Sequence, residues 1–76
     1  MDIFEKLSAI VKDVMNTDAD LTADTRLNED LKADSLDKVS MLMRLEEEFD
    51  IEIDDDKALQ FKTVGDVAEY VKDAIA

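Results

Sequence analysis

Residues 34–49 read DSLDKVSMLMRLEEEF and are the strongly amphipathic segment around which the rest of the fold is predicted. Its apolar residues recur at the three- and four-residue spacing that is typical of an amphipathic α-helix. Asp34 or Ser35 can cap this helix, because both side chains accept hydrogen bonds from N–H groups that lack a partner inside the helix. At about 100° per residue, counted from Leu36, one apolar stripe spans roughly 140° to 240°. This stripe, which we expect to face the core, consists of Met41, Leu42, Leu45 and Phe49.

The same predicted helix carries a second strip of apolar residues, at roughly 300° to 360° by the same count. This second strip consists of Leu36, Val39 and Met43. Three carboxylates border the second strip or continue it toward the end of the helix, namely those of Glu46, Glu47 and Asp50. Two interpretations remain open. Either the helix is buried on two sides and the acids are a solvated rim, or the second strip contacts a partner protein toward which the carboxylates steer basic residues.

Helices are also predicted near both ends of the chain. Residues 3–15 carry apolar side chains at helical spacing, and Asp2 with Glu5 gives this helix a start that resembles a capping box. Near the other end, Thr63 and Asp66 form a similar box before a last helix whose apolar residues again recur at helical spacing.

The segments between these helices show weaker patterns. Residues 16–34 lack sustained periodicity and are predicted to form a long loop, pinned by its leucines Leu21, Leu27 and Leu31. Residues 51–53 alternate like a strand but have no second strand to pair with, so we expect an extended connector, and residues 57–61 leave room for only a short helix. The fold expected is all-α: one domain over residues 1–76, in which three main helices and one short helix form a small antiparallel bundle.

The composition of the chain excludes several classes of function and of site. The 76 residues include 21 Asp and Glu against 9 Lys and Arg, a formal net charge of −12, and contain neither Cys nor His. Such a surface repels nucleic acid and anionic membranes and attracts basic protein surfaces. Disulfides and the usual zinc sites are excluded. Because Met1 and Asp2 do not begin a basic and then apolar leader, and no apolar run approaches the ~20 residues of a membrane span, we expect a cytoplasmic protein, as a monomer.

Ser35 stands out in a chain with so little other chemistry. A serine hydroxyl without a neighbouring base is a poor nucleophile, and this chain offers no His. Ser35 is therefore a better candidate for modification by another enzyme than for catalysis. Asp-Ser-Leu alone is weak support, because many helices begin with such a tripeptide.

The wider context of Ser35 is more specific. The run from Leu31 to Asp37, its continuation from Leu45 to Ile53, and Thr63-Val64-Gly65-Asp66 resemble bacterial acyl carrier proteins. The resemblance implies that Ser35, flanked by Asp34, Leu36 and Asp37, carries 4′-phosphopantetheine, whose thiol holds acyl groups as thioesters. It also implies modification by a basic phosphopantetheinyl transferase that uses coenzyme A. The second strip and its carboxylates then match the surface that meets acyl-loading and fatty-acid or polyketide synthase enzymes.

Members of this family enclose the acyl chain that they carry, so the resemblance also implies a role for the core in binding that chain. The resemblance implies that a fatty-acyl chain on the arm is partly buried in the bundle. Candidates for the surrounding core are apolar and include adaptable methionine. They are Met41, Leu42, Leu45, Phe49, Leu59, Phe61 and Val67.

Three residues depart from the family's pattern. Lys32 stands where members commonly have Gly, Asp54 where many have Pro, and Ser40 where a Glu is frequent. The attachment chemistry is untouched by these changes, but the choice of partner enzyme is affected, so a specialised carrier is a possibility.

The sequence leaves functions other than a fatty-acyl carrier to consider. An aminoacyl, D-alanyl or peptidyl carrier would use a similar serine and bundle. A calcium-binding module is suggested by Asn16, Asp18 and Asp20, which have the 1-3-5 spacing of an EF-hand loop, but Leu21 and Leu27 then replace the Gly and Glu that the loop requires. We therefore expect no specific metal site. Asp34 and Asp37 could serve as an acid–base pair, although no nucleophile–base pair accompanies them, so we expect a carrier that is not an enzyme.

Overall fold

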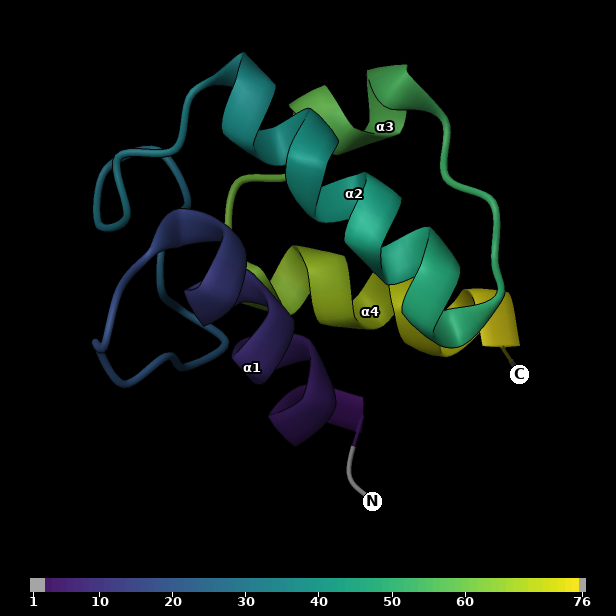
Figure 1. Ribbon diagram of the computed structural model, residues 1–76, viewed down its shortest axis with the longest axis horizontal. Coiled ribbons are helices and arrows are strands. Elements are labelled where there is room, and N and C mark those ends of the chain that lie inside the picture. The colour runs from purple at the N-terminus through teal and green to yellow at the C-terminus, as the bar shows by residue number, and fades with distance from the viewer. Residues whose placement is uncertain (1–2, 76) are drawn as a thin grey trace.

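The computed structural model describes residues 3–75, which form four helices and a long loop (Figure 1). These are α1 (Ile3–Met15), α2 (Ser35–Phe49), α3 (Asp55–Gln60) and α4 (Val64–Ile75). The predicted bounds of α1 and α2 are confirmed, and no strand occurs among the described residues. Asp2, half of the cap predicted for α1, lies outside them. At α4 the predicted box is present, because the N–H of Asp66 donates to Thr63 Oγ1 and the N–H of Thr63 donates to Asp66 Oδ2.

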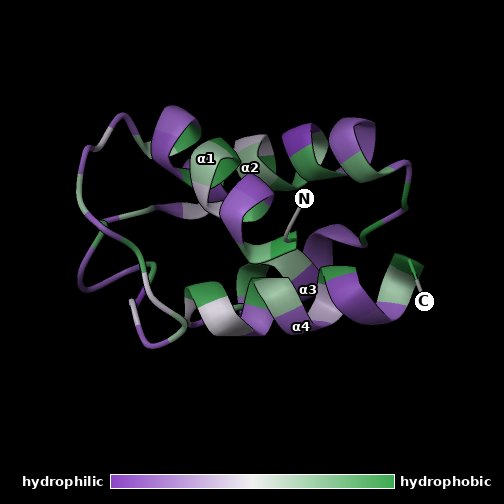
Figure 2. Cartoon of the chain, turned by 90° about the horizontal axis from the view of Figure 1, so that it is seen from below, coloured by the Kyte–Doolittle hydropathy of each residue, from purple (hydrophilic) through white to green (hydrophobic). Residues whose placement is uncertain are grey.

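The helices surround one core. The second helix, α2, packs against α1 and α3, and α4 packs against α1. In Figure 1, α1 runs antiparallel to α2, and in Figure 2 the apolar positions of α1 and α2 turn toward those of α4. The predicted all-α bundle is confirmed. The core includes most of the predicted residues, with Phe49 only half-buried, and its fully buried large side chains are Leu7, Val11, Leu27, Met41, Leu42, Leu45, Val64, Val67 and Val71.

The prediction that Leu59 belongs to the core is wrong. Leu59 is 47% exposed. The cause is the shortness of α3, whose single buried residue is Ala58. Ala58 and Phe61, three residues apart, face the core, and Leu59, one step of about 100° further round than Ala58, turns away from it.

The long loop is held by main-chain hydrogen bonds to the segment before α4. The N–H of Leu27 donates to the carbonyl of Lys62 at 2.8 Å, and the N–H of Val64 donates to that of Thr25 at 2.9 Å. Leu27 is fully buried, which confirms that the loop is pinned there. Gly65 allows the two segments to approach, because a Cβ atom at this position would lie 2.7 Å from the carbonyl oxygen of Ala23.

Candidate functional site

Ser35 is the first residue of α2, and the two aspartates beside it form the cap of this helix. Asp34 Oδ1 accepts a hydrogen bond of 2.8 Å from the N–H of Asp37, and Asp37 Oδ2 accepts one of 3.3 Å from the N–H of Asp34. Of the two predicted caps, Asp34 is therefore the one used. Asp34 and Asp37 hold the helix end together, and the side chain of Ser35 is exposed.

The geometry of this helix end fits a phosphodiester. The first N–H groups of an α-helix lack partners inside the helix, and the helix dipole places partial positive charge there. The capping box occupies the N–H of Asp37, whereas those of Ser35 and Leu36 lie at the open end. A phosphate attached to Ser35 would meet these groups, which favour an anion.

The loop before Ser35 is fixed by its last residues. Ala33 is buried, and its N–H donates to the carbonyl of Leu27 at 2.9 Å. Lys32, one of the three departures from the family pattern, has φ = 56°. This left-handed conformation suits Gly and is unfavourable for a residue with a Cβ atom. The chain therefore reaches Ser35 through a turn that Lys32 adopts at a cost.

Only part of the second strip is exposed to solvent. Leu36 is 72% exposed and Met43 is 60% exposed, both unusually high for large apolar side chains. Val39, which the sequence placed between them, is half-buried and packs against the core. The exposed part of the second strip therefore consists of Leu36 and Met43.

The three carboxylates near the second strip have different surroundings. Glu46 Oε2 accepts a hydrogen bond of 2.9 Å from the N–H of Ile53 in a half-buried position, so Glu46 holds the connector that follows α2. Asp50 ends α2 in the left-handed conformation, and its N–H donates to the carbonyl of Glu46. Glu47 is exposed. Asp50 is exposed as well, so the carboxylates of both Glu47 and Asp50 can meet a basic partner, whereas that of Glu46 is used inside the protein.

A surface depression of about 620 Å³ adjoins Met43 and is lined by Val14 of α1 and by Ser40, Met43, Arg44, Glu46 and Glu47 of α2. Arg44 Nη1 is 2.8 Å from Asp13 Oδ2, an ion pair that joins the two helices. The hydrogen bond to Asp13 raises the pKa of Arg44 above its ordinary value. Ser40 opens onto the depression without adding a carboxylate to it.

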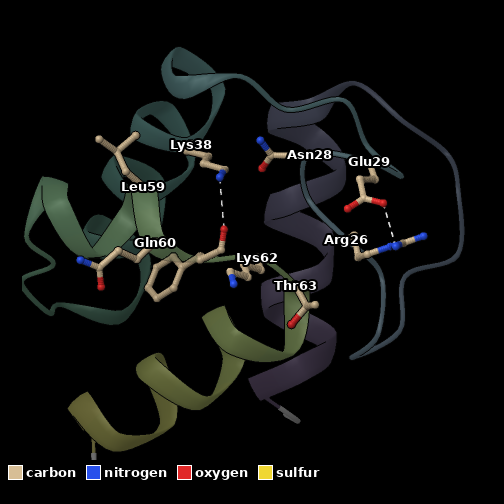
Figure 3. Close-up of a pocket in the computed structure, with 9 residues that line it drawn as sticks. Arg26, Asn28, Glu29, Lys38, Leu59, Gln60, Lys62 and Thr63 are labelled. Carbon is tan, nitrogen blue, oxygen red and sulfur yellow. Dashed lines mark hydrogen bonds and ion pairs between the residues drawn. The ribbon is translucent and has the colours of Figure 1, made fainter.

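Sequence reasoning missed Lys38, which is only 6% exposed. Its Nζ donates a hydrogen bond of 3.2 Å to the carbonyl of Phe61, which joins α2 to the segment after α3 (Figure 3). A signal was present, because Lys38 falls at about 200° in the count from Leu36, at the centre of the core stripe. Lys38 lines a cavity of about 870 Å³, the Lys38 cavity, whose other residues include Asn28, Leu59, Gln60, Phe61 and Lys62.

Two classes of site find no support within residues 3–75. No group of three or more acidic side chains is placed to hold a metal ion in that part of the chain, which includes the loop considered for calcium. Nor does any helix there have the length and apolar character needed to cross a membrane.

Comparisons with known proteins match this chain to one family over most of its length. Residues 5–71 match the family described as "Phosphopantetheine attachment site". The chain is 47% identical over 72 residues to an acyl carrier protein of Rickettsia typhi, covering 93% of this chain and 84% of that one. With an acyl carrier protein of Helicobacter hepaticus the identity is 47% over 73 residues, covering 95% and 96%.

A solved structure shows the same fold. A putative acyl carrier protein from Mycobacterium tuberculosis superposes with a TM-score of 0.88 at 38% identity, covering 93% of this chain and 96% of that one. The family match and the curated relatives extend over nearly the whole chain. The chain therefore belongs to the acyl carrier proteins, within the family defined by its phosphopantetheine attachment site.

Proposed function

We propose that this acyl carrier protein bears its 4′-phosphopantetheine on Ser35 and that residues 1–76 act as one carrier domain. The observation that carries the proposal is the placement of Ser35, which is exposed, is the first residue of α2, and lies in the segment between Asp34 and Asp37, two aspartates that cap each other. Membership of the family makes the protein a non-catalytic carrier that other enzymes modify and use.

The modification takes place in trans. A separate Mg²⁺-dependent transferase supplies the base and the metal, because this chain has no His or Cys to activate the hydroxyl. The oxygen of Ser35 forms a new bond to phosphorus, the nucleotide half of coenzyme A leaves, and the hydroxyl proton passes to the enzyme's base. This chain contributes the exposed hydroxyl and a helix end that stabilises the phosphodiester.

The cargo is an acyl thioester destined for fatty-acid synthesis or a related polyketide or lipid pathway. The names of the curated relatives support an acyl cargo over the aminoacyl, D-alanyl or peptidyl alternative. The net charge of −12 is consistent with a cytoplasmic protein that repels nucleic acid and anionic membranes and acts as a monomer among basic partners.

Partner enzymes dock on the exposed part of the second strip. Leu36 and Met43 offer apolar contact on either side of half-buried Val39, and the exposed carboxylate of Glu47 steers basic docking surfaces. Glu46 and Asp50 extend the negative potential, although Glu46 is also used inside the protein. Ser40 leaves room beside Met43, so partners that require a carboxylate at that position would bind less tightly.

The test is transfer from coenzyme A to the unmodified protein by a phosphopantetheinyl transferase, followed by intact mass. The wild type gains one phosphopantetheine. Ser35→Ala gains none, whereas Ser40→Ala, which changes another exposed serine on the same helix, gains as much as the wild type. Equal gain in Ser35→Ala would remove the proposed attachment site.

A further inference from the structure

The Lys38 cavity has a cationic lining in a strongly acidic protein. It lies between α2, the loop at residues 26–29 and the segment at residues 59–63 (Figure 3). Arg26 and Glu29 also line it, but Arg26 Nη1 and Glu29 Oε2 form an ion pair of 2.7 Å, so their charges offset each other. The remaining charged groups of the lining are the ammonium groups of Lys38 and Lys62.

Lys38 is the unusual member of this lining. A lysine ammonium offers three hydrogen-bond donors, and burial of such a charge without a counter-ion is unfavourable. Lys38 is 6% exposed, and the carbonyl of Phe61 is its hydrogen-bond acceptor among residues 3–75. Neither Lys38 nor Lys62 takes part in any ion pair of those residues, although the chain contains 21 Asp and Glu. The cavity therefore presents a buried cation with donor capacity to spare.

The position of Lys38 connects the cavity to the carrier site. Lys38 follows Ser35 by three residues, a distance of about 4.5 Å along the axis of α2. A group tethered to Ser35 by a flexible arm is present near this cavity at a high effective concentration. Leu59 and Phe61 provide apolar surface beside the two lysines, and Asn28 adds an amide.

We propose that the Lys38 cavity binds a carboxylate at the far end of the carried acyl group, so that this carrier holds dicarboxylic half-thioesters better than neutral chains of the same length. This inference rests on the proposed attachment at Ser35. The carboxylate supplies the missing counter-ion to Lys38 and Lys62, and the methylenes of the chain contact Leu59 and Phe61. The phosphodiester of the arm has the same anionic chemistry, so the test must distinguish the two sources.

The test compares two cargoes that differ by one carboxylate. The transferase loads the protein from hexanoyl-coenzyme A or from adipoyl-coenzyme A, and intact mass verifies loading. We expect the adipoyl form to melt about 5 °C above the hexanoyl form, the size expected for one charge-assisted hydrogen bond in so small a domain. The amide resonance of Lys38 should shift with adipoyl and not with hexanoyl.

Variants then assign the effect to the cavity. Lys38→Met removes the charge at similar length and should abolish the difference between the two cargoes. Lys62→Met, at an exposed position, should reduce it, and Lys72→Met, at an exposed position on α4, should leave it unchanged.

Three results would overturn the inference while leaving attachment at Ser35 intact. The first is that the two loaded forms melt at the same temperature in the wild type, a comparison that needs no variant. The second is that the difference between their melting temperatures persists in Lys38→Met. The third result is that conversion of the apo to the holo form already shifts the Lys38 amide and that adipoyl adds no further shift, which would make the phosphodiester the ligand. Failure to load, seen as no gain in mass, would instead count against the proposed function.

Discussion

The carboxylate of Glu46 accepts a hydrogen bond of 2.9 Å from the backbone N–H of Ile53, across the turn that ends α2. Glu46 therefore fixes the connector to α3 while it also lies beside the proposed docking surface. Its neighbour Glu47 is exposed. Loss of the Glu46 carboxylate should therefore affect both stability and recognition, whereas loss of the Glu47 carboxylate should affect recognition alone.

Reversal of these two charges should separate stability from recognition. Glu47→Lys should slow association with a partner enzyme and leave the free energy of unfolding within about 0.5 kcal/mol of wild type. Glu46→Lys should slow association too and also destabilise the fold by about 1 kcal/mol, since the N–H of Ile53 loses its acceptor. Urea unfolding and stopped-flow binding measure the two effects.

Glu46→Gln is the control, because its amide oxygen can still accept from Ile53 and should restore most of the stability. Equal stability of all three variants would show that the hydrogen bond contributes nothing. If neither salt nor the charge reversals change the rate of association with the partner enzyme, the second strip is not the interface.

Replacement of Lys32 by Gly should stabilise the protein. Lys32 has φ = 56°, a conformation that costs a residue with a Cβ atom about 1–2 kcal/mol, partly offset by the greater chain entropy of Gly in the unfolded state. We expect a net gain of about 0.5–1 kcal/mol in urea unfolding. Lys12→Gly, inside α1, should lower stability by a similar amount. A loss of stability in Lys32→Gly would show that the lysine side chain makes a favourable contact larger than the backbone cost.

Salt or millimolar Mg²⁺ should raise the melting temperature of the free protein. A net charge of −12 on 76 residues produces repulsion that screening relieves, and the Debye length is only about 8 Å at physiological ionic strength. Thermal melts at fixed pH with and without Mg²⁺ are sufficient. A melting temperature that stays constant or falls would contradict this account of the surface.

Neutral acyl chains attached to the arm should stabilise the bundle according to their length. Each methylene that enters the core contributes at most about 0.8 kcal/mol, reduced by the packed contacts that must open. Acetyl, hexanoyl and octanoyl forms should melt at increasing temperatures and shift the amides of core residues such as Met41, Leu42 and Val67. Identical melts, with shifts confined to the neighbours of Ser35, would mean that the chain stays in solvent.

Much of the fold could be predicted from the sequence because the helices are strongly periodic. The bounds of α1 and α2 and the box at Thr63 follow from local patterns that the structure confirms. Leu59 was misplaced because α3 is too short for periodicity to define its buried side. The pattern also could not show that Glu46 would bond to Ile53, since this contact depends on how the connector turns back.

The candidate site, too, could be predicted only in part from the sequence. The sequence predicts Ser35 and its flanking aspartates as the attachment site, which stays a prediction, but it left the cap undecided between Asp34 and Ser35, which the backbone geometry resolves. Lys38 was overlooked because a lysine in a core stripe is normally assigned to the surface, and its acceptor, the carbonyl of Phe61, lies 23 residues away. Long-range main-chain partners of this kind have no signature in composition or spacing.

Attachment at Ser35 can be tested on the protein purified from its own source, by intact mass and by mass of its peptides. We expect an added mass of one phosphopantetheine, with or without an acyl group, confined to the peptide that contains Ser35. Phosphopantetheine on any other residue would contradict it. So would an unmodified Ser35 in a protein that a phosphopantetheinyl transferase also leaves unmodified in vitro.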